Sequence, residues 1–124
     1  MRRHAIVPAV AISVLAAGCV RGTEQLLLEQ FFQASRLRDR TALERVATVI
    51  FEPLEQGTVT DFTIDAVVEL QEKPAAVSVR QATVSAPVRL PNGETARKKI
   101  VLLLEKRDRW IVTGFTVLPE RSGR

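Results

Sequence analysis

The spacing of apolar residues changes once along this chain, and that change limits the possible fold more than any other feature. Between Glu24 and Ile50 the apolar residues recur at intervals of three and four, which is the period of a helix. From Phe62 onward they alternate with polar residues, which is the period of a strand with one buried face. Helices followed by strands predict an α+β fold: two N-terminal helices packed on a curved antiparallel sheet of about four strands.

Two helices are expected before the sheet. The first spans Glu24 to Arg38, with Thr23 as its cap, and its buried stripe consists of Leu27, Leu28, Phe31, Phe32 and Ala34. The second begins at Thr41, because Thr41 and Glu44 have the spacing of a capping box. Proline cannot continue the helical hydrogen bonds, so Pro53 is expected to end it. Three arginines near the end of the first helix fit a solvated helix end, with contact to anionic lipid as the alternative: Arg36, Arg38 and Arg40.

Four strands are expected, at 62–70, about 76–90, 95–105 and 110–118. In the first, the core face consists of Phe62, Ile64, Ala66, Val68 and Leu70. The apolar residues of the second change parity, which predicts a β-bulge near Arg80 and Gln81. Pro91-Asn92-Gly93 fits a three-residue hairpin loop. The resulting register pairs apolar residues with one another: Val84 with Ile100 and Ala82 with Leu102.

The first residues have the layout of a secretion signal. A basic start, Met1-Arg2-Arg3-His4, precedes an apolar run from Ala5 to Ala17 and then Gly18 and Cys19. The run is too short for a comfortable membrane span, which needs roughly 20 residues. An ordinary signal peptide and an uncleaved membrane helix are the alternatives to a signal that is cut before a cysteine.

Leu15, Ala16, Ala17 and Gly18 followed by Cys19 resemble the lipobox of bacterial lipoproteins. The resemblance implies cleavage before Cys19 and acylation of its sulfur and amino group, with the membrane as a partner. It divides the chain into a signal peptide (1–18), a lipidated cysteine with a short tether (19–23), one α+β domain (24–118) and a polar tail (119–124). Val20 stands where an aspartate would favour inner-membrane retention. The resemblance therefore implies a lipid-anchored envelope protein, with a leaning to the outer membrane facing the periplasm.

The residue types of the mature chain argue against catalysis. His4 is the only histidine, Cys19 the only cysteine, and there is no tyrosine. No Ser/His/Asp, Cys/His or metal-binding cluster can be assembled from what remains, and no glycine-rich phosphate loop is present, so we expect no catalytic residue, metal or cofactor. Asp61 and Asp65 share a strand face, but alternation places that face in solvent.

Charge gives no reason to expect a nucleic-acid partner. Loss of Arg2 and Arg3 with the signal removes two units from the formal net charge of +4. Two basic groups remain, 97–99 and 106–109. We expect a strand to separate them rather than one patch to unite them.

Two helices followed by long antiparallel strands resemble the nuclear transport factor 2-like, cystatin-like cone. Trp110-Ile111-Val112 and Phe115 are similar to the last hairpin of many such domains. The resemblance implies a first helix across a strongly curved sheet, and a scaffold that binds small molecules or proteins. The ketosteroid isomerases of that superfamily use tyrosine and aspartate in the cone, and a chain without tyrosine cannot share that activity.

Two functions follow as expectations. The first is an envelope lipoprotein that binds a protein partner, which should show an exposed apolar patch. The second is a carrier of a small apolar ligand, which should show an enclosed pocket of roughly 300–1,000 Å³. Four aromatic residues are candidates to line such a pocket, with core packing as the alternative: Phe31, Phe62, Trp110 and Phe115.

Overall fold

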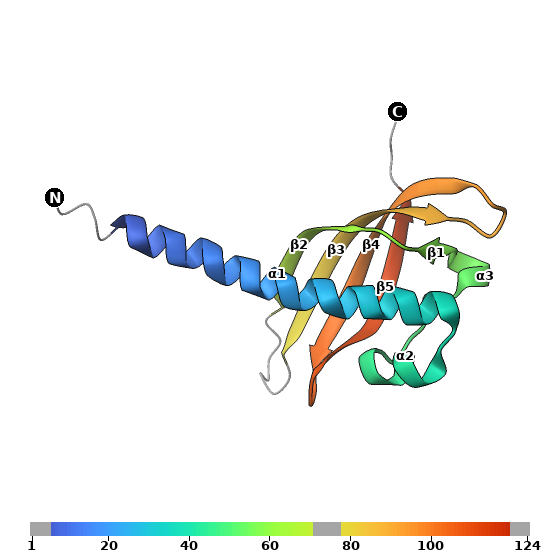
Figure 1. Ribbon diagram of the computed structural model, residues 1–124, viewed down its shortest axis with the longest axis horizontal. Coiled ribbons are helices and arrows are strands. Elements are labelled where there is room, and N and C mark those ends of the chain that lie inside the picture. The colour runs from blue at the N-terminus through green and yellow to red at the C-terminus, as the bar shows by residue number, and fades with distance from the viewer. Residues whose placement is uncertain (1–5, 71–77, 120–124) are drawn as a thin grey trace.

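The computed structural model describes the backbone of residues 6–70 and 78–119, and the side chains of residues 22–70 and 78–118. Over these residues three helices come first and an antiparallel sheet follows, curving around the longest helix (Figure 1). The elements are α1 (Ile6–Leu37), α2 (Arg40–Val46), α3 (Pro53–Gln56), β1 (Thr58–Val59), β2 (Thr63–Leu70), β3 (Val79–Arg89), β4 (Thr95–Lys106) and β5 (Trp110–Pro119). The expected α+β class, with helices packed on a curved antiparallel sheet, is confirmed.

Helix α1 begins far earlier than the sequence predicted. It starts at Ile6 rather than Glu24 and continues beyond the edge of the sheet (Figure 1). Pro8 falls in its first turn, where a missing N–H breaks no hydrogen bond, and Gly18 is tolerated inside the helix. Thr23 lies within the helix, so the prediction that it caps a new one is wrong.

A left-handed residue ends α1. Arg38 has φ 53°, its N–H donates to the Ser35 carbonyl (3.1 Å), and the Asp39 N–H donates to the Ala34 carbonyl (3.0 Å). These two bonds form a Schellman motif, in which glycine usually occupies the position of Arg38. Asp39 then caps α2, because its Oδ1 accepts the Ala42 N–H at 3.1 Å.

The predicted capping box at Thr41 is therefore wrong, and α2 is also shorter than expected. It ends at Val46, since Ala47 leaves the helix to form a parallel bridge with Val112. Pro53 does not end α2 but begins α3, at the first position of a helix, where proline is favoured.

In the sheet, β1 and β2 lie one after the other along one edge of β3, and β4 and then β5 follow on its other edge. The β3–β4 register confirms the hairpin prediction: Val84 pairs with Ile100 and Ala82 with Leu102. In the loop, Gly93 has φ 93° and its N–H donates to the Leu90 carbonyl at 2.9 Å.

The bulges lie elsewhere than predicted. β3 pairs with β4 without interruption from Val79 to Arg89, so the bulge expected near Arg80 is wrong. One bulge lies in β2 between Ile64 and Ala66. As a result Val67 packs against the core while Val68 is 50% exposed, and the assignment of Val68 to the core face is wrong.

A second bulge lies between β4 and β5. Leu103 pairs with Gly114 and Leu104 with Val112, which leaves Thr113 as the extra residue. Predictions for 1–4, for the turn at 71–74, for the strand start at 76–77 and for the tail at 120–124 lie outside the described residues.

Side chains of α1 fill the concave face of the sheet. Leu28 and Phe31 are fully buried, and so are the small strand residues Ala82 and Ala86. The core of the described residues is completed by Leu27, Phe32, Val46, Ala47, Phe51, Val59, Ile64, Val84, Val88, Ile100, Leu102, Leu104 and Val112. Helix and strand residues therefore share one hydrophobic core.

Candidate functional site

Cys19 and the four residues before it lie in the part of α1 whose side chains fall outside the description. At about 1.5 Å per residue, Cys19 lies about 7.5 Å along the helix axis from Glu24. Cleavage and acylation at Cys19 stay predictions. Among the described residues no helix combines the length and the apolar composition needed to cross a membrane.

A buried ion pair attaches α1 to the sheet close to Cys19. Glu24 is 2% exposed, and its Oε2 accepts a hydrogen bond from Arg80 Nη1 at 2.7 Å. Arg80 Nε donates to Glu69 at 2.9 Å, and its guanidinium lies 4.2 Å from the centre of the Trp110 ring. Burial opposes the charged form of Arg80, but the hydrogen bonds to Glu69 and Glu24 raise its pKa above the ordinary value. We call these four residues the arginine clamp.

Sequence reasoning missed the arginine clamp, although a signal was present. Arg80 has the same parity in its strand as the buried Ala82 and Val84. Glu24 lies on the same helix face as Leu27 and Leu28. Opposite charges at core-facing positions of two elements indicate a buried pair, because an unpaired buried charge is costly.

Three of the four predicted pocket residues belong to one aromatic cluster. The ring centres of Phe31 and Phe115 lie 6.4 Å apart, and Phe62 joins them through Phe32, at 5.5 Å. Phe51 completes the cluster with its ring 5.1 Å from Phe115. Sequence reasoning missed Phe51 because it lies in a loop, where periodicity carries no information.

The fourth residue, Trp110, stands apart in the arginine clamp at the far end of β5. Phe62 and Phe32 line a cavity of about 240 Å³ whose remaining walls are mostly polar, with Gln25, Glu29, Gln33, Arg36, Val59, Thr60 and Asp61. The structure therefore brings three predicted residues together as packed rings and does not bring Trp110 to them.

Two open grooves flank α2, at the end of α1 farthest from Cys19. Groove A has a volume of about 290 Å³ and lies between α1 and α2, with Leu37 on its rim, 61% exposed. Its lining residues are Gln30, Gln33, Ala34, Leu37, Asp39, Ala42, Arg45 and Val46. Groove B has a volume of about 600 Å³ and lies between α2 and α3. Its lining residues are Arg38, Arg40, Leu43, Ile50, Glu52, Leu54 and Glu55.

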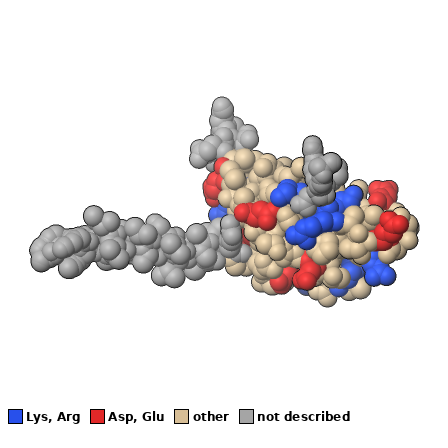
Figure 2. Space-filling model, turned by 90° about the horizontal axis from the view of Figure 1, so that it is seen from above, with Lys and Arg blue, Asp and Glu red and all other residues tan. Residues whose placement is uncertain are grey.

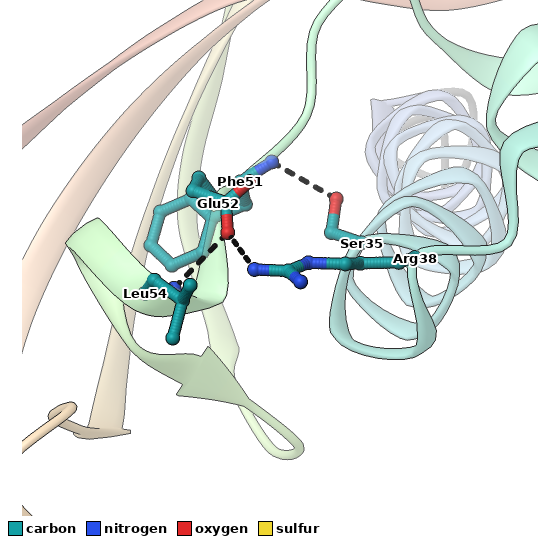
Figure 3. A network of polar contacts seen from close by, with 5 residues as sticks. All are labelled: Ser35, Arg38, Phe51, Glu52 and Leu54. Carbon is teal, nitrogen blue, oxygen red and sulfur yellow. Dashed lines mark hydrogen bonds and ion pairs between the residues drawn. The ribbon is translucent and has the colours of Figure 1, made fainter.

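Groove B carries the most exposed large apolar side chain of the described residues, Leu54, at 71%. Three polar contacts fix the end of α1 and the segment around Glu52 beside this groove (Figure 3). The Ser35 hydroxyl accepts the Phe51 N–H at 3.0 Å, and Glu52 accepts the Leu54 N–H at 3.1 Å. Arg38 forms an ion pair with Glu52. The Leu54 hydrogen bond and then the Arg38 hydrogen bond lower the pKa of the Glu52 carboxyl, so it is ionised at neutral pH.

The arginines at the end of α1 are therefore partly engaged by the protein itself. Arg36 Nη1 donates to the Val59 carbonyl at 3.4 Å and Arg38 pairs with Glu52, while Arg40 lines groove B. These contacts within the domain fit the expected helix end, and contact with anionic lipid stays a prediction.

The two predicted carboxylates do not converge. Asp61 is exposed ahead of β2, and Asp65 is exposed on the outer face of the sheet, as alternation predicted. Asp65 Oδ2 accepts hydrogen bonds from the Ser85 hydroxyl (2.6 Å) and from Lys99 Nζ (3.2 Å). The Ser85 bond, followed by the Lys99 contacts, lowers the pKa of Asp65 despite the opposing effect of burial.

The two basic groups lie at opposite ends of β4, which starts at Thr95 and ends at Lys106. Lys99 and Lys106 are seven residues apart along this strand, roughly 23 Å, so the groups form no single patch. Figure 2 shows one face on which Lys and Arg side chains gather in the middle with Asp and Glu around them.

The described residues offer surfaces for binding. Within them, no three His, Cys, Asp or Glu side chains lie close enough together to hold a metal ion. No family model, curated protein or solved structure matches this chain. The geometry of the grooves and of the filled interior is therefore the basis for a functional proposal.

Proposed function

We propose that this chain is a lipid-anchored protein of the bacterial cell envelope that binds a protein partner and catalyses no reaction. The acylated Cys19 holds it on the membrane. The surface formed by grooves A and B, with Leu37 and Leu54 exposed beside them, is where the partner binds. The observation that carries the proposal is this pair of exposed leucines on an open surface, together with an interior that is already filled.

The filled interior supports a partner rather than a carried ligand. Leu28 and Phe31 of α1 are fully buried against the sheet, and the phenylalanine rings contact one another. A ligand on the concave face would need to displace these side chains. A partner at the grooves would need to displace only water, and would bury leucines that are now 61% and 71% exposed.

The residue types support a binding role over an enzymatic one. The mature chain would lack histidine and tyrosine, and its one cysteine would carry lipid. The carboxylates of the grooves are Asp39, Glu52 and Glu55. Two of them are engaged in local structure, Asp39 as the α2 cap and Glu52 in its ion pair, which leaves no arrangement of an acid and a base facing a common point.

The anchor is tested by mass spectrometry of the protein isolated from a bacterial membrane. We expect a chain that begins at Cys19 and carries acyl groups on its sulfur and amino group. The Cys19→Ser variant should retain residues 1–18 or appear as a soluble form. A Cys19→Ser protein that is cut before residue 19 and stays on the membrane at high salt would refute lipid anchoring.

The partner surface is tested by native mass spectrometry of the protein gently extracted from its own membrane. A second polypeptide should remain with the wild-type chain and should be lost from Leu54→Glu and Leu37→Glu. Leu26→Glu is the matched control, because Leu26 is 56% exposed on α1 and lines neither groove. Equal retention by Leu54→Glu and Leu26→Glu would contradict the assignment of the partner to the grooves.

The alternative is a carrier of a small apolar ligand that uses the interior lined by Phe31, Phe62, Trp110 and Phe115. The same extraction distinguishes the two functions. A small apolar mass retained by the monomer, and lost on Phe31→Ala, would favour the carrier.

A further inference from the structure

The end of the domain that bears the β4–β5 turn lies next to the predicted lipid anchor. Residues 107–109 form this turn, with Lys106 and Trp110 paired across it. Trp110 contacts Arg80, and Arg80 contacts Glu24, so one side chain connects the turn to the helix position five residues after Cys19. Even a fully extended chain could separate Cys19 from Glu24 by only about 18 Å.

The opposite end of the sheet cannot be equally close to Cys19. The β3–β4 hairpin lies a full strand length away, roughly 35 Å along β4, on the side away from the N-terminal half of α1 (Figure 1). The rim of the grooves at Leu37 lies about 27 Å from Cys19 along the helix axis. Of the described turns and helix ends, the β4–β5 turn is therefore nearest to a bilayer that holds acylated Cys19.

The chemistry of this turn suits a lipid surface. Three of its side chains are basic, Lys106, Arg107 and Arg109, and all three residues are exposed. Arg107 forms an exposed ion pair with Glu105 at 3.0 Å, and Arg109 Nη1 donates to the Arg45 carbonyl at 3.2 Å. Lys106, in contrast, has no acidic partner among the ion pairs of the described residues. With Glu105 and Asp108 counted, segment 105–109 has a small positive balance. Lys106 Nζ lies 5.9 Å from the centre of the Trp110 ring. Tryptophan beside lysine and arginine is the combination that gathers at the interface between headgroups and hydrocarbon.

We propose that the β4–β5 turn contacts the phosphate groups of lipid headgroups, with Lys106, Arg107 and Arg109 as the contacting side chains, and so orients the anchored domain on the bilayer. This inference rests on the acylation of Cys19 in the proposed function. The arginine clamp makes the orientation rigid, because it fixes α1 at Glu24 to Arg80 of β3, which contacts Trp110 directly after the turn. Leu37, on the rim of groove A, is then about 27 Å along the helix from Cys19, while Arg45 of the same groove contacts the turn through Arg109.

Trp110 is the only tryptophan of the chain and lies beside this turn, so its fluorescence reports the orientation. The test uses the full lipidated protein in phosphatidylethanolamine vesicles that contain phosphatidylglycerol. A fraction of the lipid carries a nitroxide quencher on its headgroup. We expect strong quenching of Trp110. A control protein carries Trp110→Phe, which keeps an aromatic ring against Arg80, with Leu118→Trp, which moves the reporter roughly 25 Å along β5 to an exposed position. We expect this second reporter to be quenched much less.

Charge reversal identifies the contacting side chains. Lys106→Glu, Arg107→Glu and Arg109→Glu together should reduce the quenching of Trp110 severalfold, since each basic residue near an anionic surface contributes about fivefold to binding. The matched control reverses the other basic group with Arg97→Glu, Lys98→Glu and Lys99→Glu. It should leave the quenching of Trp110 unchanged.

Each outcome decides between distinct conclusions. Mass spectrometry first shows that Cys19 is acylated. If the two tryptophan reporters are then quenched equally, or if the two charge reversals have equal effects, the proposed orientation is wrong but the anchor is not. A Cys19 without lipid would overturn the anchor and with it this inference. Circular dichroism of both charge-reversed proteins checks that they are folded, and single reversals at Lys106 or Arg107 replace the triple variant if it is not.

Discussion

Replacement of Gly57 by alanine should destabilise the domain more than any other single-methyl addition at a described glycine. Gly57 follows α3 with φ 96° and ψ −165°, a region open almost only to glycine. A Cβ placed there would lie 2.4 Å from the carbonyl oxygen of Arg89 and 2.9 Å from a methyl carbon of Val88. The obstructing oxygen belongs to the β3 backbone, which pairs with β1 immediately after Gly57.

Two costs add at this position. The backbone conformation alone costs an alanine about 1–3 kcal/mol. The contact with Arg89 and Val88 adds about 1–3 kcal/mol, because neither a paired strand nor a buried valine can move away freely. We therefore expect Gly57→Ala to lower the free energy of unfolding by about 3 kcal/mol or more.

The measurement is urea unfolding, followed by circular dichroism and by the fluorescence of Trp110. Gly93→Ala is the matched control, since Gly93 also has a positive φ of 93° but no atom within 4 Å of the added carbon. It should cost only the backbone strain, about 1–2 kcal/mol. If the two substitutions lower the free energy of unfolding by the same amount, the close approach of Gly57 to β3 adds no cost and the reasoning is wrong.

Three further predictions concern charged residues. Arg80→Met should cost about 3–5 kcal/mol in urea unfolding, because it leaves the buried carboxylate of Glu24 unpaired, whereas Arg107→Met at an exposed pair should change stability by less than about 1 kcal/mol. Similar losses would refute the arginine clamp. The pKa of Asp65 is held below its ordinary value of 3.8, so its carboxylate stabilises the fold above that pH and loses this effect as the pH falls through the lower folded-state value. Thermal melts should therefore show wild type more stable than Asp65→Asn at neutral pH but not in strong acid, and a constant difference would contradict the assignment. Arg38→Gly should be close to neutral, because relief of the left-handed backbone, about 1 kcal/mol, offsets the loss of an exposed ion pair; a large loss in urea unfolding would show that the ion pair, and not the backbone, dominates there.

Local chemistry explains which parts of the fold the sequence predicted. Pro91, Asn92 and Gly93 set a hairpin loop of fixed length, and that loop fixes every pair of the β3–β4 ladder. The order of helical and alternating periods likewise determines the α+β class. These features depend on neighbours in sequence and need no knowledge of tertiary contacts.

The misplaced bulge has a different cause. The bulge was inferred from a change of parity, because the apolar residues stand at odd positions up to Val79 and at even ones from Ala82. Arg80 has the even parity of Ala82 and faces the core through a buried ion pair, so the strand continues without a change of phase. The real bulge at Thr113 left its own signal. Val112 packs on the core at an even position, and Phe115 and Val117 pack there at odd ones. A change of parity beside Gly114 was therefore the stronger indication.

The grooves could not be predicted from the sequence. They depend on α1 ending in a left-handed Arg38, where the pattern of helix ends favours glycine. They also depend on α3, a single turn held by the Glu52 cap. An exposed leucine such as Leu54 is unremarkable in a sequence and becomes informative only beside an open groove.

One helix carries the proposed anchor, the arginine clamp and the rim of a groove, and this has a consequence for the partner. Cys19 and Leu37 are separated by about 27 Å of helix, a length that the domain cannot change without breaking hydrogen bonds. Because Glu24 fixes the same helix to the sheet, the domain cannot pivot about the helix while the clamp is intact. With the proposed anchor and orientation, a partner that binds Leu37 and Leu54 would therefore have to extend well beyond the lipid headgroups. A partner confined to the bilayer would contact the β4–β5 turn instead, and would be lost on reversal of Lys106 and Arg107 but not on Leu54→Glu.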